Sequence, residues 1–175
     1  MIFRLARKSR SGPKSAGRKL FAAAVRQARQ PALYATMGAP DTTEGRFELL
    51  TLHVILLLET LRGRGEESPA SSQALFDAYV SDLDGALREM GVGDLTVGKR
   101  MRALGGAFYG RAAAYRGALA GLPDRRALES LINRTIMPTG GVAAPLADYV
   151  ARCRDALAGL ETTELLVNGA PWPAA

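Results

Sequence analysis

The chain has 175 residues and a mass of 18.6 kDa, a length that suits one domain or two small ones. Hydrophobic residues make up 47% and charged residues 23%, which excludes wholesale disorder, a collagen-like repeat and a disulfide scaffold. The single cysteine, Cys153, forms no internal disulfide, and no Cys or His spacing suits a structural zinc site, so we expect a reducing compartment. The longest strongly apolar run covers only residues 54–58, so we expect no segment that crosses a bilayer.

Charge is divided unevenly along the sequence. Residues 1–30 contain no acid, whereas the other residues carry 14 of the 23 cations and all 17 acids, a formal net charge of −3. The pI near 9.9 therefore comes from the N-terminal segment, and the rest of the chain is mildly acidic. The nine cations of this segment are Arg4, Arg7, Lys8, Arg10, Lys14, Arg18, Lys19, Arg26 and Arg29.

Residues 1–30 are predicted to form a basic, partly helical arm. Residues 1–17 combine Arg and Lys with Ser, Gly and Pro and show little apolar periodicity, a pattern typical of a mobile segment. Beyond them, Leu20 and Phe21 belong to an apolar arc of a helix whose opposite arc is basic, and Pro31 is predicted to end this helix. Cleavage as a signal peptide is not expected, because the apolar stretch is weak and interrupted.

The arm has two equally weighted interpretations. In the first, its cations bind an anionic surface, either lipid, where each contributes about 1 kcal/mol, or ribosomal RNA phosphates; the composition also suits a mitochondrial transit peptide. In the second, the helix packs on the body and its basic face is solvated. Because the apolar periodicity of the other helices lies beyond Pro31, we expect residues 32–160 to fold without the arm.

The body, residues 31–160, is predicted to be all-α, a single compact domain of about five or six helices. Asp41 precedes Glu44 by three residues, the pattern of a capping box, and predicts a helix that runs to about Arg62. Apolar residues surround most of this segment, which indicates a central helix covered on several sides.

The remaining elements are also helices. Predicted segments run over about 70–90, over 97–122 with Thr96 as its cap, from Pro123 to Pro138, and over 143–160, followed by an irregular tail at 161–175. Three glycines, Gly105, Gly106 and Gly110, fall inside the 97–122 helix, where each costs about 1 kcal/mol relative to Ala. We therefore expect them to mark a close approach to another helix. No segment alternates as a strand would.

No catalytic or metal site can be assembled from these residues. Residues 93–99, GDLTVGK, approach the pattern of a phosphate-binding loop, but Arg100 follows where a magnesium-binding hydroxyl is required. His53 is the single histidine and lies among leucines, which favours a hydrogen-bonded core residue over a catalyst or a haem ligand. The residues alone thus predict a binding or assembly module that is not an enzyme and holds no cofactor or metal.

Three stretches together resemble the ubiquinol–cytochrome c chaperone family. They are GAPDTTEGRFELLTLH at 38–53, DLDGALREMGVGDLTVGK at 82–99 and AFYGRAAAYRGAL at 107–119. The resemblance covers about residues 32–157, and its middle block is the most specific part. It departs from the family pattern at Arg116, where an acid is common, and at Thr135, where Asn is common.

The resemblance implies a non-catalytic chaperone that holds newly inserted cytochrome b during biogenesis of the ubiquinol–cytochrome c reductase complex. It also implies the ribosome and a small helper protein as further partners, and no DNA. We expect a bacterial protein that is cytoplasmic and peripherally associated with the inner membrane, or in the mitochondrial matrix if eukaryotic. The alternative is a helical adaptor whose basic arm binds ribosome, RNA or a membrane surface without a client of its own.

Within the matched blocks, Lys99, Tyr109, Arg111 and Tyr115 are the candidates for a partner surface. Interfaces favour Tyr and Arg, and positions 108, 111 and 115 share one helical face. Tyr115 has a second interpretation, as a core residue with only its hydroxyl exposed. His53 is a weaker partner candidate, since a bond within the fold is the favoured interpretation. The nine cations of residues 1–30 are the candidates for a membrane or ribosome surface.

Overall fold

The computed structural model describes residues 12–175, except for the side chains of residues 94 and 95. The described chain folds into eight helices and contains no strand, which confirms the all-α class and corrects the expected number of five or six helices. The helices are α1 (Pro13–Ala28), α2 (Pro31–Ala35), α3 (Thr43–Leu61), α4 (Ser68–Glu89), α5 (Asp94–Ala120), α6 (Arg126–Thr135), α7 (Ala144–Ala158) and α8 (Thr162–Asn168).

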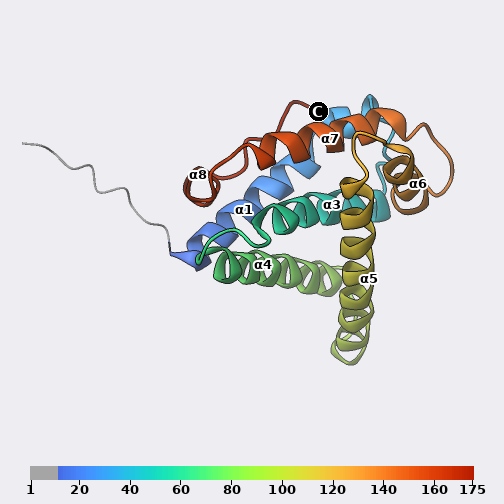
Figure 1. Ribbon diagram of the computed structural model, residues 1–175. Helices are drawn as coiled ribbons and strands as arrows, with labels where there is room; N and C mark the ends of the chain where they lie inside the picture. The colour runs from blue at the N-terminus through green and yellow to red at the C-terminus, as the bar shows by residue number, and fades with distance from the viewer. Residues whose placement is uncertain (1–11) are drawn as a thin grey trace, which may run out of the picture.

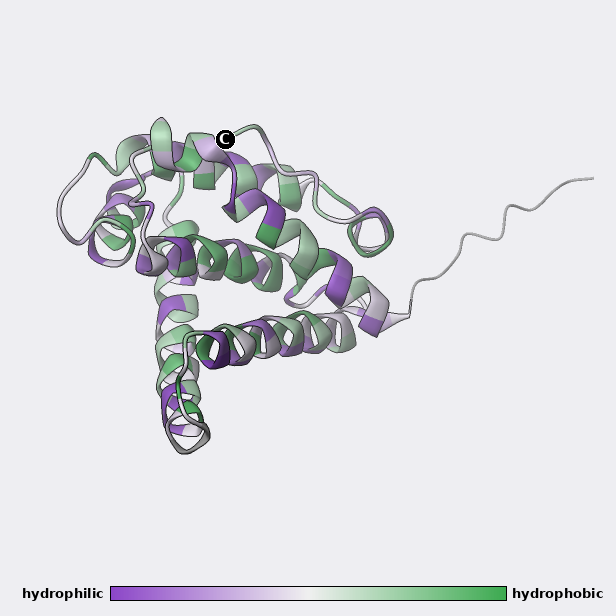
Figure 2. Ribbon diagram, turned by 180° about the vertical axis from the view of Figure 1, so that it is seen from behind, coloured by the Kyte–Doolittle hydropathy of each residue, from purple (hydrophilic) through white to green (hydrophobic). Residues whose placement is uncertain are grey.

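Helix α3 is the central element of the domain, as its all-round apolar pattern predicted. Leu49, Leu52 and residues 54–57 are buried, and α1, α4, α5 and α7 all pack against this helix. Figure 1 shows α3 between α1, α4 and α7, and Figure 2 shows its ribbon in mostly hydrophobic colours. Burial of an entire helix circumference places the core of the domain along α3.

The start of α3 is capped by Thr42 and not by Asp41. The Thr42 hydroxyl accepts a 3.1 Å hydrogen bond from the backbone N–H of Gly45, as an N-cap side chain does. Asp41 lies one residue too early for this bond and instead pairs with Arg46 at 2.6 Å. The hydrogen bond from Arg46 lowers the pKa of Asp41 below its ordinary value.

Helix α1 belongs to the folded core, in contrast to the expected separable arm. Leu20 and Ala24 are fully buried, and α1 forms the most extensive helix pair of the domain with α4. Gly17 makes this close packing possible, because a Cβ at this position would stand 2.5 Å from the Cβ of Ala74. The packed-helix interpretation therefore applies to residues 13–28, while folding of residues 32–160 without them stays a prediction.

Helix α5 makes no close approach at the glycines that were expected to mark one. At Gly105, Gly106 and Gly110 an added Cβ would meet nothing within 4 Å, and the last two are exposed. The N-terminal half of α5 extends beyond the rest of the molecule (Figure 1), so these glycines face open space. The prediction failed because helical glycine is compatible with exposure as well as with tight packing.

The C-terminal tail is more regular than expected. Residues 162–168 form α8, whose Leu165 and Leu166 are buried, so residues 161–175 are not wholly irregular. Residues 31–35, which show no clear periodicity, form α2 with Pro31 at its first position, where a missing N–H costs nothing. Pro31 thus follows the end of α1 and begins a new helix.

Candidate functional site

His53 is a core residue, and its hydrogen-bond network connects α3 with α7 and α1. Its ring is fully buried, and Nδ1 donates to the carbonyl of Leu49 at 2.7 Å, which leaves Nε2 to accept from the Tyr149 hydroxyl at 2.7 Å. The Tyr149 hydroxyl accepts in turn from the amide of Gln27 on α1, at 2.9 Å. Because burial disfavours the charged ring, the pKa of His53 falls to about 4. His53 is therefore a neutral structural residue and is not on a partner surface.

The C-terminal residues lie over the same buried network. The Trp172 ring packs edge-on against His53, with 5.0 Å between ring centroids. Gln27 also donates to the carbonyl of Pro173 at 3.1 Å, and Arg152 donates to that of Ala174 at 3.4 Å. The chain end thus covers the junction of α1, α3 and α7 (Figure 1).

Arg111, a predicted partner residue, is an internal ion-pair residue. Its guanidinium donates two hydrogen bonds to the Glu48 carboxylate, one of them from Nε at 2.7 Å. The Glu48 side chain is only 8% exposed and that of Arg111 is 26% exposed, so the pair connects α3 and α5 close to the core. The hydrogen bond to Glu48 raises the pKa of Arg111. Arg111 also lies over the ring of Phe47, at 6.0 Å from its centroid.

Replacing Arg111 with Met is expected to destabilise the fold by about 2 kcal/mol, because it leaves the Glu48 carboxylate buried without its partner. The free energy of unfolding in urea measures this loss. In the double variant with Glu48→Met most of the loss should be regained, since no charge is then buried. Arg116→Met is the surface control; its 45% exposed side chain pairs with Glu59, and we expect a loss of about 1 kcal/mol or less. A double variant as unstable as Arg111→Met alone would contradict this account.

Of the other three α5 residues predicted for a partner surface, one is buried in the core and two are exposed. Tyr115 is 1% exposed, and its hydroxyl lies 3.4 Å from the hydroxyl of Thr135, so its core interpretation applies. Burial raises the pKa of Tyr115 to about 12. Lys99 is exposed on the first half of α5, and Tyr109 is 66% exposed beside the rings of Phe76 and Phe108. Of the residues predicted for a partner surface on α5, Lys99 and Tyr109 are therefore the exposed ones.

The predicted surface cations are partly outside the described residues. Four of the nine lie outside the described residues, namely Arg4, Arg7, Lys8 and Arg10. A fifth, Lys19, donates a hydrogen bond from Nζ to the carbonyl of Val167 at 2.6 Å. The remaining four, Lys14, Arg18, Arg26 and Arg29, are all exposed on α1 and at its C-terminal end. The surface prediction for these four stays open.

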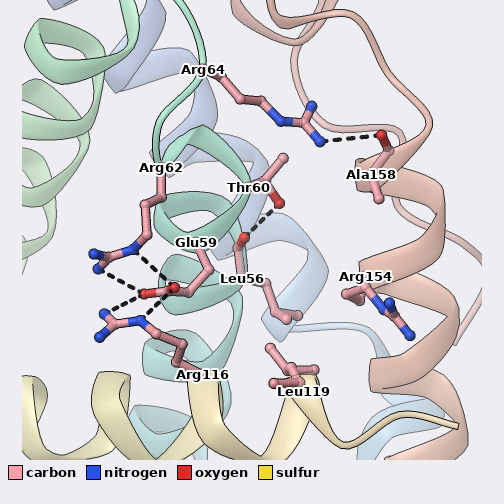
Figure 3. Close-up of a pocket in the computed structure, with 10 residues that line it drawn as sticks. Leu56, Glu59, Thr60, Arg62, Arg64, Arg116, Leu119, Arg154 and Ala158 are labelled. Carbon is pink, nitrogen blue, oxygen red and sulfur yellow. Dashed lines mark hydrogen bonds and ion pairs between the residues drawn. The ribbon is translucent and has the colours of Figure 1, made fainter.

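Four arginines border a hollow of about 400 Å³ where the C-terminal ends of α3, α5 and α7 meet. Figure 3 shows that Arg62 and Arg116 meet at the Glu59 carboxylate, whereas Arg154 stands on the opposite wall. Burial raises the pKa of Glu59, but the hydrogen bonds from the two guanidiniums outweigh it and hold the pKa below its ordinary value. Arg64 is directed to the carbonyl of Ala158 at 3.2 Å. Arg62 and Arg116 share Glu59, whereas Arg64 and Arg154 have other partners, so the four guanidiniums form no common anion site.

An apolar groove lies between α1, α3, α4 and α5. Its volume is about 420 Å³, within the usual range for ligand sites. The floor consists of half-buried apolar side chains, and Met90, which is 64% exposed, stands at the rim. Charged side chains of both signs border it. The apolar lining includes Val25, Phe47, Leu50, Leu83, Leu87 and Leu104.

The groove was not predicted from the sequence, although its signal was present. Leu83, Leu87 and Met90 repeat at spacings of four and three, a pattern that is typical of a helix packing seam. Periodicity identifies an apolar face but does not say whether another helix covers it. In the structure the last turns of α4 are only partly covered, and the apolar face becomes a groove wall.

Other classes of site are not found in the described part of the chain. Among the described side chains, those of residues 12–93 and 96–175, no group of three or more His, Cys, Asp or Glu is placed to hold a metal ion. No helix within this range combines the length and apolar character that a membrane span requires. Residues 94–99 of the near match to a phosphate-binding loop lie in the first turns of α5, and no strand precedes them in the described chain.

Comparisons with known proteins point to one family. A family model described as ubiquinol-cytochrome C chaperone matches residues 35–172, which include all three blocks noted in the sequence. Among solved structures, the chain is similar to the Cbp3 homolog from Brucella abortus, with 34% identity and a TM-score of 0.85. That similarity covers 99% of this chain and 97% of the other. No functionally curated protein matches. The family match extends over more than half of the sequence, and we conclude that the chain belongs to the ubiquinol–cytochrome c chaperone family.

Proposed function

We propose that the protein is a non-catalytic chaperone that binds newly made cytochrome b during assembly of the ubiquinol–cytochrome c reductase complex. The family match over residues 35–172 carries this proposal. The similarity to the Cbp3 homolog supports it, because nearly the whole of both chains shares one fold.

The apolar groove between α1, α3, α4 and α5 is the candidate site for the client. A groove of about 420 Å³ with a floor of Leu, Phe and Val side chains suits one face of an apolar helix, which inserts residues at spacings of three and four. The Met90 side chain at its rim is flexible and adapts to different apolar surfaces. Hydrophobic segments are abundant in a membrane protein such as cytochrome b.

Deletion of the gene in a host that respires through a cytochrome bc complex tests the proposal. We expect the deletion strain to lose most of its haem-loaded cytochrome b, measured by difference spectroscopy of isolated membranes, and a plasmid copy to restore it. Normal levels of haem-loaded cytochrome b in the deletion strain would contradict the proposed chaperone function.

A charge placed at the groove rim should impair capture of the client. Met90→Glu is expected to reduce cytochrome b co-isolated with the chaperone about tenfold, since a carboxylate must be desolvated against an apolar helix. Val142→Glu is the matched control, because Val142 is 73% exposed, similar to Met90 at 64%, but does not line the groove. Tyr109→Glu tests the other exposed candidate in the same assay. If Tyr109→Glu rather than Met90→Glu abolishes capture, the client site lies on the outer face of α5.

A further inference from the structure

The outer face of α1 carries a line of cations that pair with no acid. Lys14, Arg18, Arg26 and Arg29 are all exposed, and none forms an ion pair or a hydrogen bond within residues 12–175. At 100° per residue they fall within an arc of about 120° and extend over about 20 Å of helix. We call these four residues the α1 basic stripe.

The opposite arc of the same helix is fixed inside the domain. Ala16, Leu20 and Ala24 are buried against α3 and α4, so the apolar face of α1 is not available to insert into a lipid bilayer. Figure 2 shows the hydrophilic positions recurring along the α1 ribbon. The stripe is therefore a set of positive charges on the outer face of a helix that is packed on the body.

We propose that the α1 basic stripe docks the protein on the headgroups of an anionic phospholipid bilayer. Exposed cations along one face of a packed helix complement a flat, negatively charged surface, to which each cation adds about fivefold in affinity. Exposed positions between the cations, Ser15 and Ala22, offer no aromatic ring to stack on bases, as recognition of single-stranded RNA requires. Docking involves no insertion, because the apolar arc of α1 is already buried.

The stripe also borders the apolar groove. Arg29 belongs to both, and Val25 and Ala28 of α1 line the groove beside it. A bilayer in contact with the stripe would therefore lie next to the groove opening, where an apolar segment leaving the membrane is within reach. Membrane docking does not depend on the identity of that segment, so the proposal stands apart from the proposed client.

Sedimentation of the full chain with vesicles tests the proposal. We expect binding to vesicles that contain phosphatidylglycerol and none to vesicles of phosphatidylcholine alone. Raising the salt from about 0.1 M to about 1 M should abolish binding, since the Debye length falls from about 10 Å to about 3 Å. Binding that survives high salt, or that is equal on neutral vesicles, would overturn the proposal, because insertion and not charge would then hold the protein.

Matched variants locate the surface. Lys14→Gln, Arg18→Gln and Arg26→Gln together should weaken vesicle binding on the order of a hundredfold, with the helical circular dichroism unchanged. The control triple, Arg100→Gln, Arg102→Gln and Arg134→Gln, removes the same charge from exposed positions on α5 and α6 and should bind nearly as the wild type does. Equal losses in both triples would overturn the stripe as the site.

Two further measurements separate this proposal from its alternatives. A single-stranded RNA oligonucleotide that binds in place of anionic vesicles would overturn the lipid assignment in favour of an RNA surface. Co-isolation of cytochrome b is measured with the stripe triple after detergent extraction. Retained capture together with lost vesicle binding supports docking as a separate property, whereas lost capture with unchanged vesicle binding contradicts it.

Discussion

Replacing Gly17 with Leu is expected to lower the free energy of unfolding by about 3 kcal/mol, among the largest effects of any single substitution in α1. A Cβ at this position would stand 2.5 Å from the Cβ of Ala74 and 2.6 Å from the backbone nitrogen of Leu75. Neither atom can rotate aside, because one is a backbone nitrogen and the other is a Cβ fixed to the α4 backbone, so the two helices must separate. Urea unfolding followed by circular dichroism measures the change.

The same small substitution should have opposite signs at two glycines. Gly17→Ala is expected to destabilise the protein despite the higher helix propensity of Ala, because the added methyl group collides with α4. Gly106→Ala is the control; it adds a methyl group in open space and should stabilise α5 by about 1 kcal/mol. Equal effects at both positions would show that α1 and α4 do not pack as closely as the structure indicates.

These two glycines show where sequence reasoning about packing reaches its limit. Three glycines in one helix suggested close approach at Gly105, Gly106 and Gly110, yet the contact occurs at Gly17. The sequence around a glycine shows only that this position has no side chain. Whether a neighbour fills the space depends on which helices meet, and that is decided by long-range packing.

The helices themselves were predictable because their apolar periodicity is long and regular. The central position of α3 followed from apolar residues around its whole circumference, and α4 and α7 begin and end close to the expected residues. The two short helices, α2 and α8, were missed because five and seven residues are too few to establish a period. Helix α1 was identified as amphipathic, but periodicity did not specify that its apolar face packs on the body.

The candidate surface residues were harder to predict for a physical reason. Tyr and Arg are favoured at interfaces and also within domains, where Arg111 meets Glu48 and Tyr115 meets Thr135. The sequence does not show whether such a Tyr or Arg lies at an interface or inside the domain until the helix that faces it is known. The groove was missed for the converse reason, since an uncovered apolar face has the same sequence pattern as a covered one.

Acidification is expected to destabilise the protein through His53. The pKa of this side chain is 6.5 in an exposed state and about 4 in the folded protein, where burial disfavours the charged ring. Below pH 6.5 the unfolded chain therefore takes up a proton that the folded chain does not. Stability falls as the pH decreases from about 6.5 to about 4, by about 3 kcal/mol in total, and this contribution then levels off.

A comparison with His53→Gln isolates this effect from the carboxylates that titrate in the same range. The variant loses hydrogen bonds and is less stable near neutral pH, but its free energy of unfolding should fall about 3 kcal/mol less than that of the wild type between pH 6.5 and 4. Urea unfolding at closely spaced pH values gives both curves. Tyr149→Phe is the control, since it removes the hydroxyl bonded to Nε2 while the ring stays buried, and most of the pH dependence should remain. Parallel curves for the wild type and His53→Gln would mean that the folded protein accepts the proton, and the neutral network of Gln27, Tyr149 and His53 would then be wrong.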